Sequence, residues 1–232
     1  MIPRVSVVIV SYRSRSSLEP CLTSLAECAR EVPLEVIVVD NASQDGTWQW
    51  IAARHPEVRM IANTENLGFT RGVNQGVAAA GGKALLLLNP DCAVRPEALG
   101  RLLEVLEERP CAAAVAPLLI DDAGRVARSC GRFPDLWTLA CDHLGLASAF
   151  PGSTLFGGYK YGGTPLERLD RVDWASGAAL LIPRRAWDAI GGFDEQLFMY
   201  MEEVDWCRRG ARVGWGQPER LASHPMPGDE TA

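Results

Sequence analysis

The chain has 232 residues, of which 47% are hydrophobic and 22% are charged, and its formal net charge is −6. These values suit one soluble α/β domain with a sizeable core. The acidic balance argues against a nucleic-acid partner, because duplex binders usually carry a basic face. The seven cysteines are scattered without a CxxC pair, so we expect free thiols and a cytoplasmic protein.

The first 120 residues alternate between strand and helix patterns. Continuous apolar, β-branched runs predict buried strands at 5–12, 34–43, 58–63, 83–91 and 111–120. Apolar residues at helical spacing predict helices at 14–30, 45–55, 68–82 and 95–110. This alternation predicts a doubly wound, mostly parallel sheet of the Rossmann-like type.

The alternation breaks near residue 121, so we divide one domain into two halves, 1–120 and 121–232. Residues 121–134 have the pattern of a hairpin, and residues 135–150 predict an apolar helix or lid. No apolar run is long enough for a transmembrane segment. The apolar stretch 136–150 suits peripheral membrane contact but lacks a basic face, so a lid or homodimer contact is the favoured alternative.

Polar residues follow three of the predicted strands, where ligands bind in open α/β sheets. They are Ser11 and Tyr12, Asp40 and Asn41, and Asn89 and Asp91. No GxGxxG turn follows the first strand, and the chain has no P-loop motif. A divalent cation on Asp91 would hold phosphates in place of such a loop.

A second acidic group, Glu202, Glu203 and Asp205, lies beside Tyr200 and Trp206. On a helix Glu202 and Asp205 would share a face, and Glu203 would point away from them. Crowding of carboxylates beside aromatic rings raises at least one pKa, which prepares a general base. The alternative is a solvated helix start, where acidic residues favour the positive end of the helix.

In order along the chain, these motifs resemble the inverting nucleotide-sugar glycosyltransferases of family 2, of the GT-A type, and their bacterial rhamnosyltransferase-like branch. The resemblance rests on "VSVVIVSYRSRSSLEPCLTSL", "VIVVDNASQDGT", "ENLGFTRGVNQGVAAAGGKALLLLNPD" and "WASGAALLIPRRAWDAIGGFDEQLFMYMEEVDWCRR". It implies a GT-A fold with a nucleotide-sugar half, 1–120, and a smaller acceptor-side α+β region, 121–232. The implied reaction is a metal-assisted single displacement from a dTDP- or UDP-sugar, with L-rhamnose from dTDP-rhamnose as the leading donor. The implied acceptor is a cell-surface polysaccharide or a lipid-linked saccharide at the inner face of the membrane.

The resemblance also assigns roles to individual residues. It makes Glu203 the general base, with Glu202 and Asp205 as neighbours, and it makes Asp91 and His224 ligands of Mg²⁺ or Mn²⁺. The nucleotide-sugar site would comprise Ser11, Tyr12, Asp40, Asn41, Arg71, Asn74, Asn89 and Asp91. Acceptor contacts are expected from Trp174, Ser176 and Gly177.

The C-terminal stretch departs from the family pattern. A strand-like Val-x-Tyr-x-Pro segment is replaced by "RVGWGQPERLASHPMPGDETA", which predicts an altered or truncated end. His224 is therefore as well explained by a disordered tail as by a metal ligand. An inactive GT-A-like binding or scaffold protein is the alternative function. A nucleotidyltransferase is disfavoured, because "SYRSRSS" is not a Gly-rich basic loop.

Overall fold

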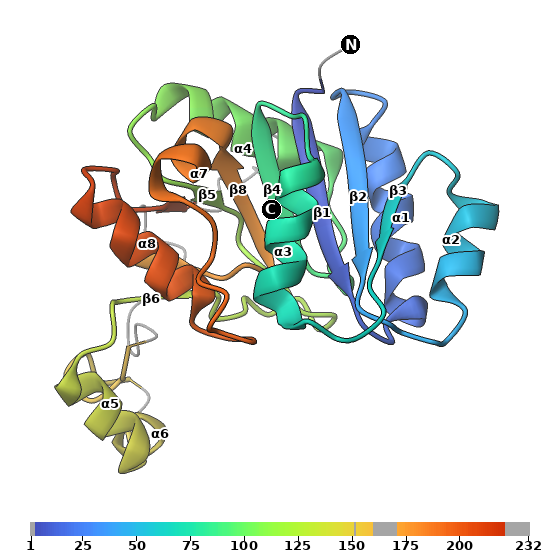
Figure 1. Cartoon of the computed structure of the whole chain (residues 1–232). Helices are drawn as coiled ribbons and strands as arrows, with labels where there is room; N and C mark the ends of the chain where they lie inside the picture. The colour runs from blue at the N-terminus through green and yellow to red at the C-terminus, as the bar shows by residue number, and fades with distance from the viewer. Residues whose placement is uncertain (1–2, 151, 160–170, 221–232) are drawn as a thin grey trace, which may run out of the picture.

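The computed structural model describes residues 3–150, 152–159 and 171–220, and its main feature is a seven-stranded sheet (Figure 1). The strand order is β3-β2-β1-β4-β8-β5-β9, with β8 antiparallel to both β4 and β5 and the other neighbours parallel. The strands are β1 (Val5–Ser11), β2 (Leu34–Asp40), β3 (Arg59–Ala62), β4 (Ala84–Leu88), β5 (Val115–Ala116), β8 (Ala179–Pro183) and β9 (Glu219–Arg220). The predicted α/β fold with a mostly parallel sheet is confirmed.

Helices cover both faces of this sheet. They are α1 (Arg15–Cys28), α2 (Thr47–Arg54), α3 (Gly68–Ala79), α4 (Pro96–Glu108), α7 (Arg184–Ile190) and α8 (Glu202–Arg212). The remaining helices, α5 (Leu136–His143) and α6 (Leu146–Ala149), lie away from the sheet (Figure 1). Val8 and Val10 of β1 belong to the core shared with α3, α7 and α8, whereas Val7 and Ile9 belong to the core shared with α1, α2 and α4. Alternate residues of a strand point to opposite faces, so every position of β1 is buried.

The carboxyl ends of β1, β2 and β4 meet at one edge of the sheet. Ser11 and Asp40 are register partners at the ends of β1 and β2. The backbone N–H of Asn89, just after β4, donates to the carbonyl of Ala178 over 2.9 Å. The turn that precedes β8 therefore lies beside the end of β4. Because β8 belongs to the second half of the sequence, both halves of the chain build one sheet.

The strand predicted at 111–120 is much shorter in the structure. Only Val115–Ala116 forms β5, and Ala112 makes an isolated bridge with Gly216. The segment is rich in alanine, which has low strand propensity, and Pro117 has no N–H to donate to a neighbouring strand. Composition that suits burial is thus not enough to extend the strand.

The segment 121–150 also differs in detail from its prediction. A bridge between Ile120 and Val126 confirms a tight turn, but Cys130–Gly131 forms β6, which pairs with β7 (Trp174–Ala175) in a separate two-stranded sheet. The single predicted helix at 135–150 is two helices, α5 and α6. Gly145 separates them with a left-handed φ of 72°.

Gly76 of α3 offers a test of the packing that places this helix on the sheet. A Cβ on Gly76 would overlap Cγ1 of Val8, whereas a Cβ on Gly100 of α4 would meet no atom within 4 Å. We expect Gly76→Ala to lower the free energy of unfolding by about 1–3 kcal/mol through overpacking. Gly100→Ala, the matched control, should raise it by about 0.5–1 kcal/mol. Urea unfolding measures both, and equal effects would contradict the close packing of α3.

Candidate active site

Ser43 ties together the loops that follow β1 and β2. Its hydroxyl donates to Oδ1 of Asp40 and accepts the backbone N–H of Arg13 over 2.9 Å. Asp40 is buried, and the hydroxyl of Ser11 lies 2.8 Å from that of Ser14. Tyr12 is 45% exposed, with the Arg13 guanidinium 5.2 Å from the centre of its ring. The sheet edge thus offers a fixed carboxylate beside an exposed aromatic ring.

Asn41 joins the end of β2 to the start of α3. Its amide nitrogen donates to the carbonyl of Gly68 over 2.9 Å, and its oxygen accepts from the Asn63 amide over 2.8 Å. The side chain is buried. These bonds give Asn41 a structural function, and its predicted contact with a nucleotide stays a prediction.

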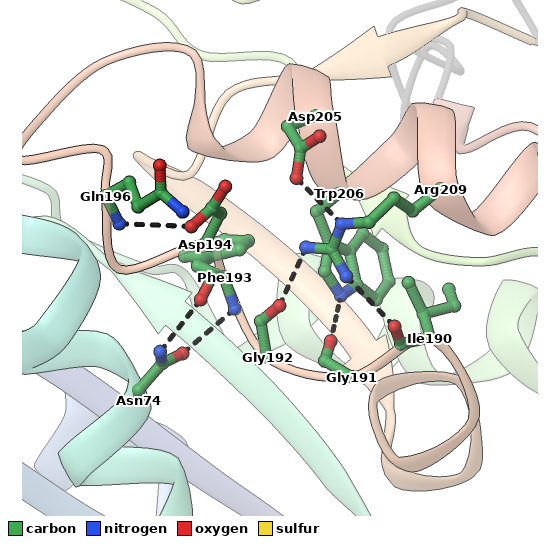
Figure 2. A network of polar contacts seen from close by, with 10 residues as sticks. All are labelled: Asn74, Ile190, Gly191, Gly192, Phe193, Asp194, Gln196, Asp205, Trp206 and Arg209. Carbon is green, nitrogen blue, oxygen red and sulfur yellow. Dashed lines mark hydrogen bonds and ion pairs between the residues drawn. The ribbon is translucent and has the colours of Figure 1, made fainter.

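Arg71 and Asn74 project from α3 toward the segment after α7. The Asn74 amide donates to the carbonyl of Phe193 over 2.9 Å and accepts the Phe193 N–H over 3.0 Å (Figure 2). Nε of Arg71 lies 3.5 Å from the Glu195 carboxylate, and both side chains are about half exposed. Arg71 also lines a recess of about 340 Å³ with Phe198. Arg71 is therefore accessible to a ligand, whereas the Asn74 amide is bound to backbone.

Asp91 presents an exposed carboxylate just after β4, and its Oδ1 atom lies 3.8 Å from Sγ of Cys92. Within residues 3–150, 152–159 and 171–220, no group of three or more His, Cys, Asp or Glu side chains could hold a metal ion. His224 lies outside the described residues. Mg²⁺ usually binds one or two carboxylates together with water and substrate phosphates. This donor set fits a cation shared with a diphosphate and does not fit a preformed metal cage.

The acid pair stands at the start of α8, directly after Met201. Glu202 is 5% exposed, and its Oε2 atom is buried without a hydrogen-bond partner in the described part of the chain. Burial, then the charge of Glu203 and a hydrogen bond with its side chain, raise the pKa of Glu202 to about 7. The expectation that Glu203 points away from Glu202 is therefore wrong.

Asp205 is engaged elsewhere on α8. Its Oδ2 atom lies 2.7 Å from Nε of Arg209, one helical turn further on. The three acidic residues thus separate into a coupled pair and an ion-paired aspartate. A direct catalytic function for Asp205 stays a prediction, but its described partner is a cation of the same helix.

The residues predicted to contact the acceptor lie on β7 and in the turn after it. Trp174 is buried, its indole N–H donates to the carbonyl of Arg132 over 2.8 Å, and its ring lies 5.9 Å from that of Tyr159. The Ser176 hydroxyl accepts the Ala178 N–H over 3.2 Å. A Cβ on Gly177, which is buried, would lie 3.5 Å from the Phe69 ring. Trp174 has the contacts of a buried support, and its stacking on a sugar stays a prediction.

Tyr159 is a candidate that the sequence did not single out. Burial, together with the charges of Asp142 and Glu203, raises the pKa of its phenol. Tyr159 comes from the segment after α6, and the charge of Glu203 contributes to the shift of its pKa. An aromatic residue within a Gly-rich stretch is the only sequence signal that marks it.

Residues with a left-handed backbone conformation occur in the loops that carry the candidate site residues. In the described ranges, the non-glycine residues with positive φ are Arg13, Ala42, Gln44, Tyr200 and Met201. They lie in the loops after β1 and β2 and in the segment that enters α8. Such conformations cost about 1–3 kcal/mol each and cluster at functional sites. This strain marks the same three segments that carry the polar residues.

Comparison with protein families shows a match to the family model "Glycosyl transferase family 2" over residues 6–153. This range includes β1 from its second residue, β2 to β4, and every residue predicted above for the nucleotide-sugar site. It ends before the acid pair on α8. The match therefore covers most of the predicted nucleotide-sugar half, 1–120, and relatives extend the similarity to the rest.

Two curated proteins are similar over nearly the whole chain. The N-acetylglucosaminyl-diphospho-decaprenol L-rhamnosyltransferase of Mycobacterium tuberculosis is 36% identical over 221 residues, which are 90% of this chain and 71% of that protein. A low-salt glycan biosynthesis hexosyltransferase of Haloferax volcanii is 26% identical over 238 residues, covering 100% of this chain and 70% of that protein.

Solved structures of glycosyltransferases share the fold. TarS of S. aureus in complex with UDP has a TM-score of 0.64 and 16% identity, with 95% of this chain and 58% of that chain covered. A mannosyltransferase from Pyrobaculum calidifontis, solved with GDP-Man and Mn²⁺, has a TM-score of 0.62 and 19% identity, with 97% and 59% covered. The chain thus spans under two thirds of these solved chains, and at such identity the likeness shows the fold alone.

Proposed function

The chain belongs to glycosyltransferase family 2, and from this premise we propose that it transfers a sugar from a nucleotide donor to a saccharide or lipid-linked acceptor. The observation that carries the proposal is the acid pair at the start of α8, in which Glu202 is buried and Glu203 is half-buried. A buried carboxyl group with a pKa of about 7 is expected of acid–base chemistry near neutral pH. A structural helix start would leave its acidic residues exposed to solvent.

We propose dTDP-rhamnose as the donor and L-rhamnose as the sugar that is transferred. This proposal is supported by the 36% identity with a relative named as a rhamnosyltransferase. The name of that relative also specifies a diphospho-decaprenol acceptor, which supports a lipid-linked acceptor here. UDP-hexoses are the alternative donors, because a relative at 26% identity is named as a hexosyltransferase.

On the donor side, Asp40 would accept hydrogen bonds from the nucleobase, with Ser11, Tyr12 and Asn41 around the nucleoside. Asp91 would hold Mg²⁺ or Mn²⁺ together with the donor diphosphate, and the side-chain carbonyl oxygen of Asn89 would be a further, uncharged ligand. Such a cation supplies electrostatic stabilisation of the negative charge that develops on the leaving diphosphate. Arg71, exposed in the first turn of α3, would contribute a further positive charge.

On the acceptor side, Glu203 would remove the proton from the acceptor hydroxyl. The hydroxyl oxygen forms a bond to the anomeric carbon while the bond from that carbon to the diphosphate oxygen breaks, which inverts the configuration. Glu202, protonated below a pKa of about 7, would donate a hydrogen bond to Glu203 and fix its orientation. Two carboxyl groups with separated pKa values can thus serve different functions.

Helices α5 and α6 support a peripheral membrane contact. Exposed apolar side chains on and around them are Leu136, Trp137, Leu139, Leu144, Phe150 and Leu155. The two helices project away from the sheet (Figure 1). Within the described ranges, no helix has the length and apolar character to cross a bilayer. Co-sedimentation with phospholipid vesicles tests the contact, and a lack of binding would favour a lid or dimer surface.

A thermal-shift screen tests the function as a whole. We expect dTDP-rhamnose with Mn²⁺ to raise Tm by about 5–10 °C at a hundredfold excess over Kd, which stabilises by about 2.7 kcal/mol. Neither the nucleotide sugar nor the metal alone should give the full shift, because Asp91 supplies one carboxylate. The same screen with UDP- and GDP-sugars identifies the nucleobase that the donor site prefers. No shift with any donor would favour the inactive scaffold.

A further inference from the structure

Arg209 on α8 binds three separate groups with its guanidinium. Nε donates to Oδ2 of Asp205 over 2.7 Å, Nη1 to the carbonyl of Ile190 over 2.9 Å, and Nη2 to the carbonyl of Gly192 over 2.7 Å (Figure 2). The side chain is 29% exposed. It therefore differs from a surface ion pair, because it also fixes the backbone of another segment.

That segment, residues 190–193, leads away from the end of α7. Between the two carbonyls bound by Arg209, the carbonyl of Gly191 accepts the indole N–H of Trp206 over 2.8 Å. Three successive carbonyls at the end of α7 are thus bound by α8. Carbonyls at a helix end have no partner within their own helix, and a cation there is stabilising.

The other end of segment 190–193 is bound by α3. Asn74 holds both the N–H and the carbonyl of Phe193. A Cβ on Gly192 would lie 2.8 Å from Oδ1 of Asn74, so a larger residue here would push the Asn74 amide away from Phe193. The segment therefore connects α3, which borders the donor side, with α8, which carries the acid pair. Figure 2 shows both ends of the connection.

The face of α8 that binds segment 190–193 is also the face of Glu202. Asp205 and Arg209 are four residues apart, and Glu202 precedes Asp205 by three, so all three lie along one side of the helix. A rotation or slide of α8 would break the bonds to the carbonyls of residues 190, 191 and 192. We propose that Arg209, held by Asp205, is a positioning residue that fixes the acid pair relative to α3. This inference rests on the proposed function.

Arg209→Lys tests the proposal because lysine keeps the charge but cannot bind two carbonyls and a carboxylate in fixed directions. Arg101→Lys is the matched control, since Arg101 on α4 pairs with Glu104 and Glu108 of its own helix. For the parent and both variants, we would measure kcat, the donor KM and amide hydrogen exchange. All measurements would be made well below Tm.

We expect Arg209→Lys to lower kcat about 10–100-fold, because small misplacements of reacting groups have effects of this size. The donor KM should stay within about twofold, since β1, β2 and β4 are untouched. Exchange should accelerate in residues 190–193 and the first turn of α8, and it should be unchanged in β1. The control should match the parent in all three measurements.

Two results would overturn the positioning function of Arg209. One is a kcat and an exchange pattern that match the parent. The other is faster exchange throughout the sheet, which would make Arg209 a general stabilising residue. If the parent itself transfers no sugar, the proposed function fails, and the exchange data alone still decide whether Arg209 holds the start of α8.

Discussion

Replacing Asp91 with asparagine should remove the dependence of donor binding on Mn²⁺ and lower sugar transfer by about 10²–10³-fold. Asp91 is the exposed carboxylate that follows β4, and the described residues offer no cluster of three ligands that could replace it. Asparagine keeps the size of the side chain and one carbonyl oxygen but removes the charge. Calorimetric titration of dTDP-rhamnose, with and without Mn²⁺, measures the binding effect.

The matched control is Asp122→Asn in the exposed turn between Asp121 and Arg125. It removes the same charge from a similar loop and should leave binding and transfer unchanged. If Asp91→Asn retains the metal dependence of the parent, the cation is held by other residues. Attention would then turn to His224, which lies outside the described ranges.

The sequence predicted the structure of residues 5–110 well because the signals in this part of the chain are local. Four strands, β1 to β4, and the helices between them have strong apolar patterns, and each is present within a few residues of its prediction. The antiparallel β8 between β4 and β5 could not be placed in this way. Its position depends on long-range pairing, such as Leu88 with Ala179, for which the sequence carries no local signal.

The candidate site was predicted as a set of residue types, but not as a set of contacts. Asn74 was expected to contact the donor, and the structure gives it paired bonds with Phe193. Asp205 was grouped with the glutamates, and its described partner is Arg209. Both outcomes depend on the backbone of segment 190–193. Nearly every residue has a backbone carbonyl and N–H group, so the sequence does not show which of these groups a side chain will bind. The structure is therefore needed to tell which polar residues near a site are free to contact a ligand and which are bound to other parts of the protein.

The second large effect is expected from the acid pair. Glu203→Gln should keep donor binding and lose transfer by about 10²–10⁴-fold, the usual contribution of a general base. Glu202→Gln should have a smaller effect at neutral pH, because its amide can donate the hydrogen bond that protonated Glu202 donates to Glu203. Single-turnover transfer, with donor binding measured in parallel, separates the two. If Glu202→Gln abolished transfer and Glu203→Gln were tolerated, the base would be Glu202.

The pH dependence gives an independent test of the same pair. The pKa of Glu202 is raised from 4.5 to about 7, so the folded protein binds more protons than the unfolded chain between these values. The free energy of unfolding must then fall as pH rises through this window. Glu202→Gln removes the penalty for burying the charge, and it should raise the stability at pH 8 by roughly 2–3 kcal/mol.

The substitution Glu202→Gln should therefore raise the free energy of unfolding at pH 8 and lower the rate of sugar transfer. In the parent, a step in the transfer rate near pH 7 would reflect the titration of the coupled pair, whose apparent pKa values belong to both groups together. Glu202→Gln should lack that step while unfolding at higher urea concentration at pH 8. A step that persists in this variant would place the titrating group elsewhere, and Tyr159 would not explain it, because its phenol titrates above its ordinary value of 10. The remaining candidate in the acid pair would be Glu203.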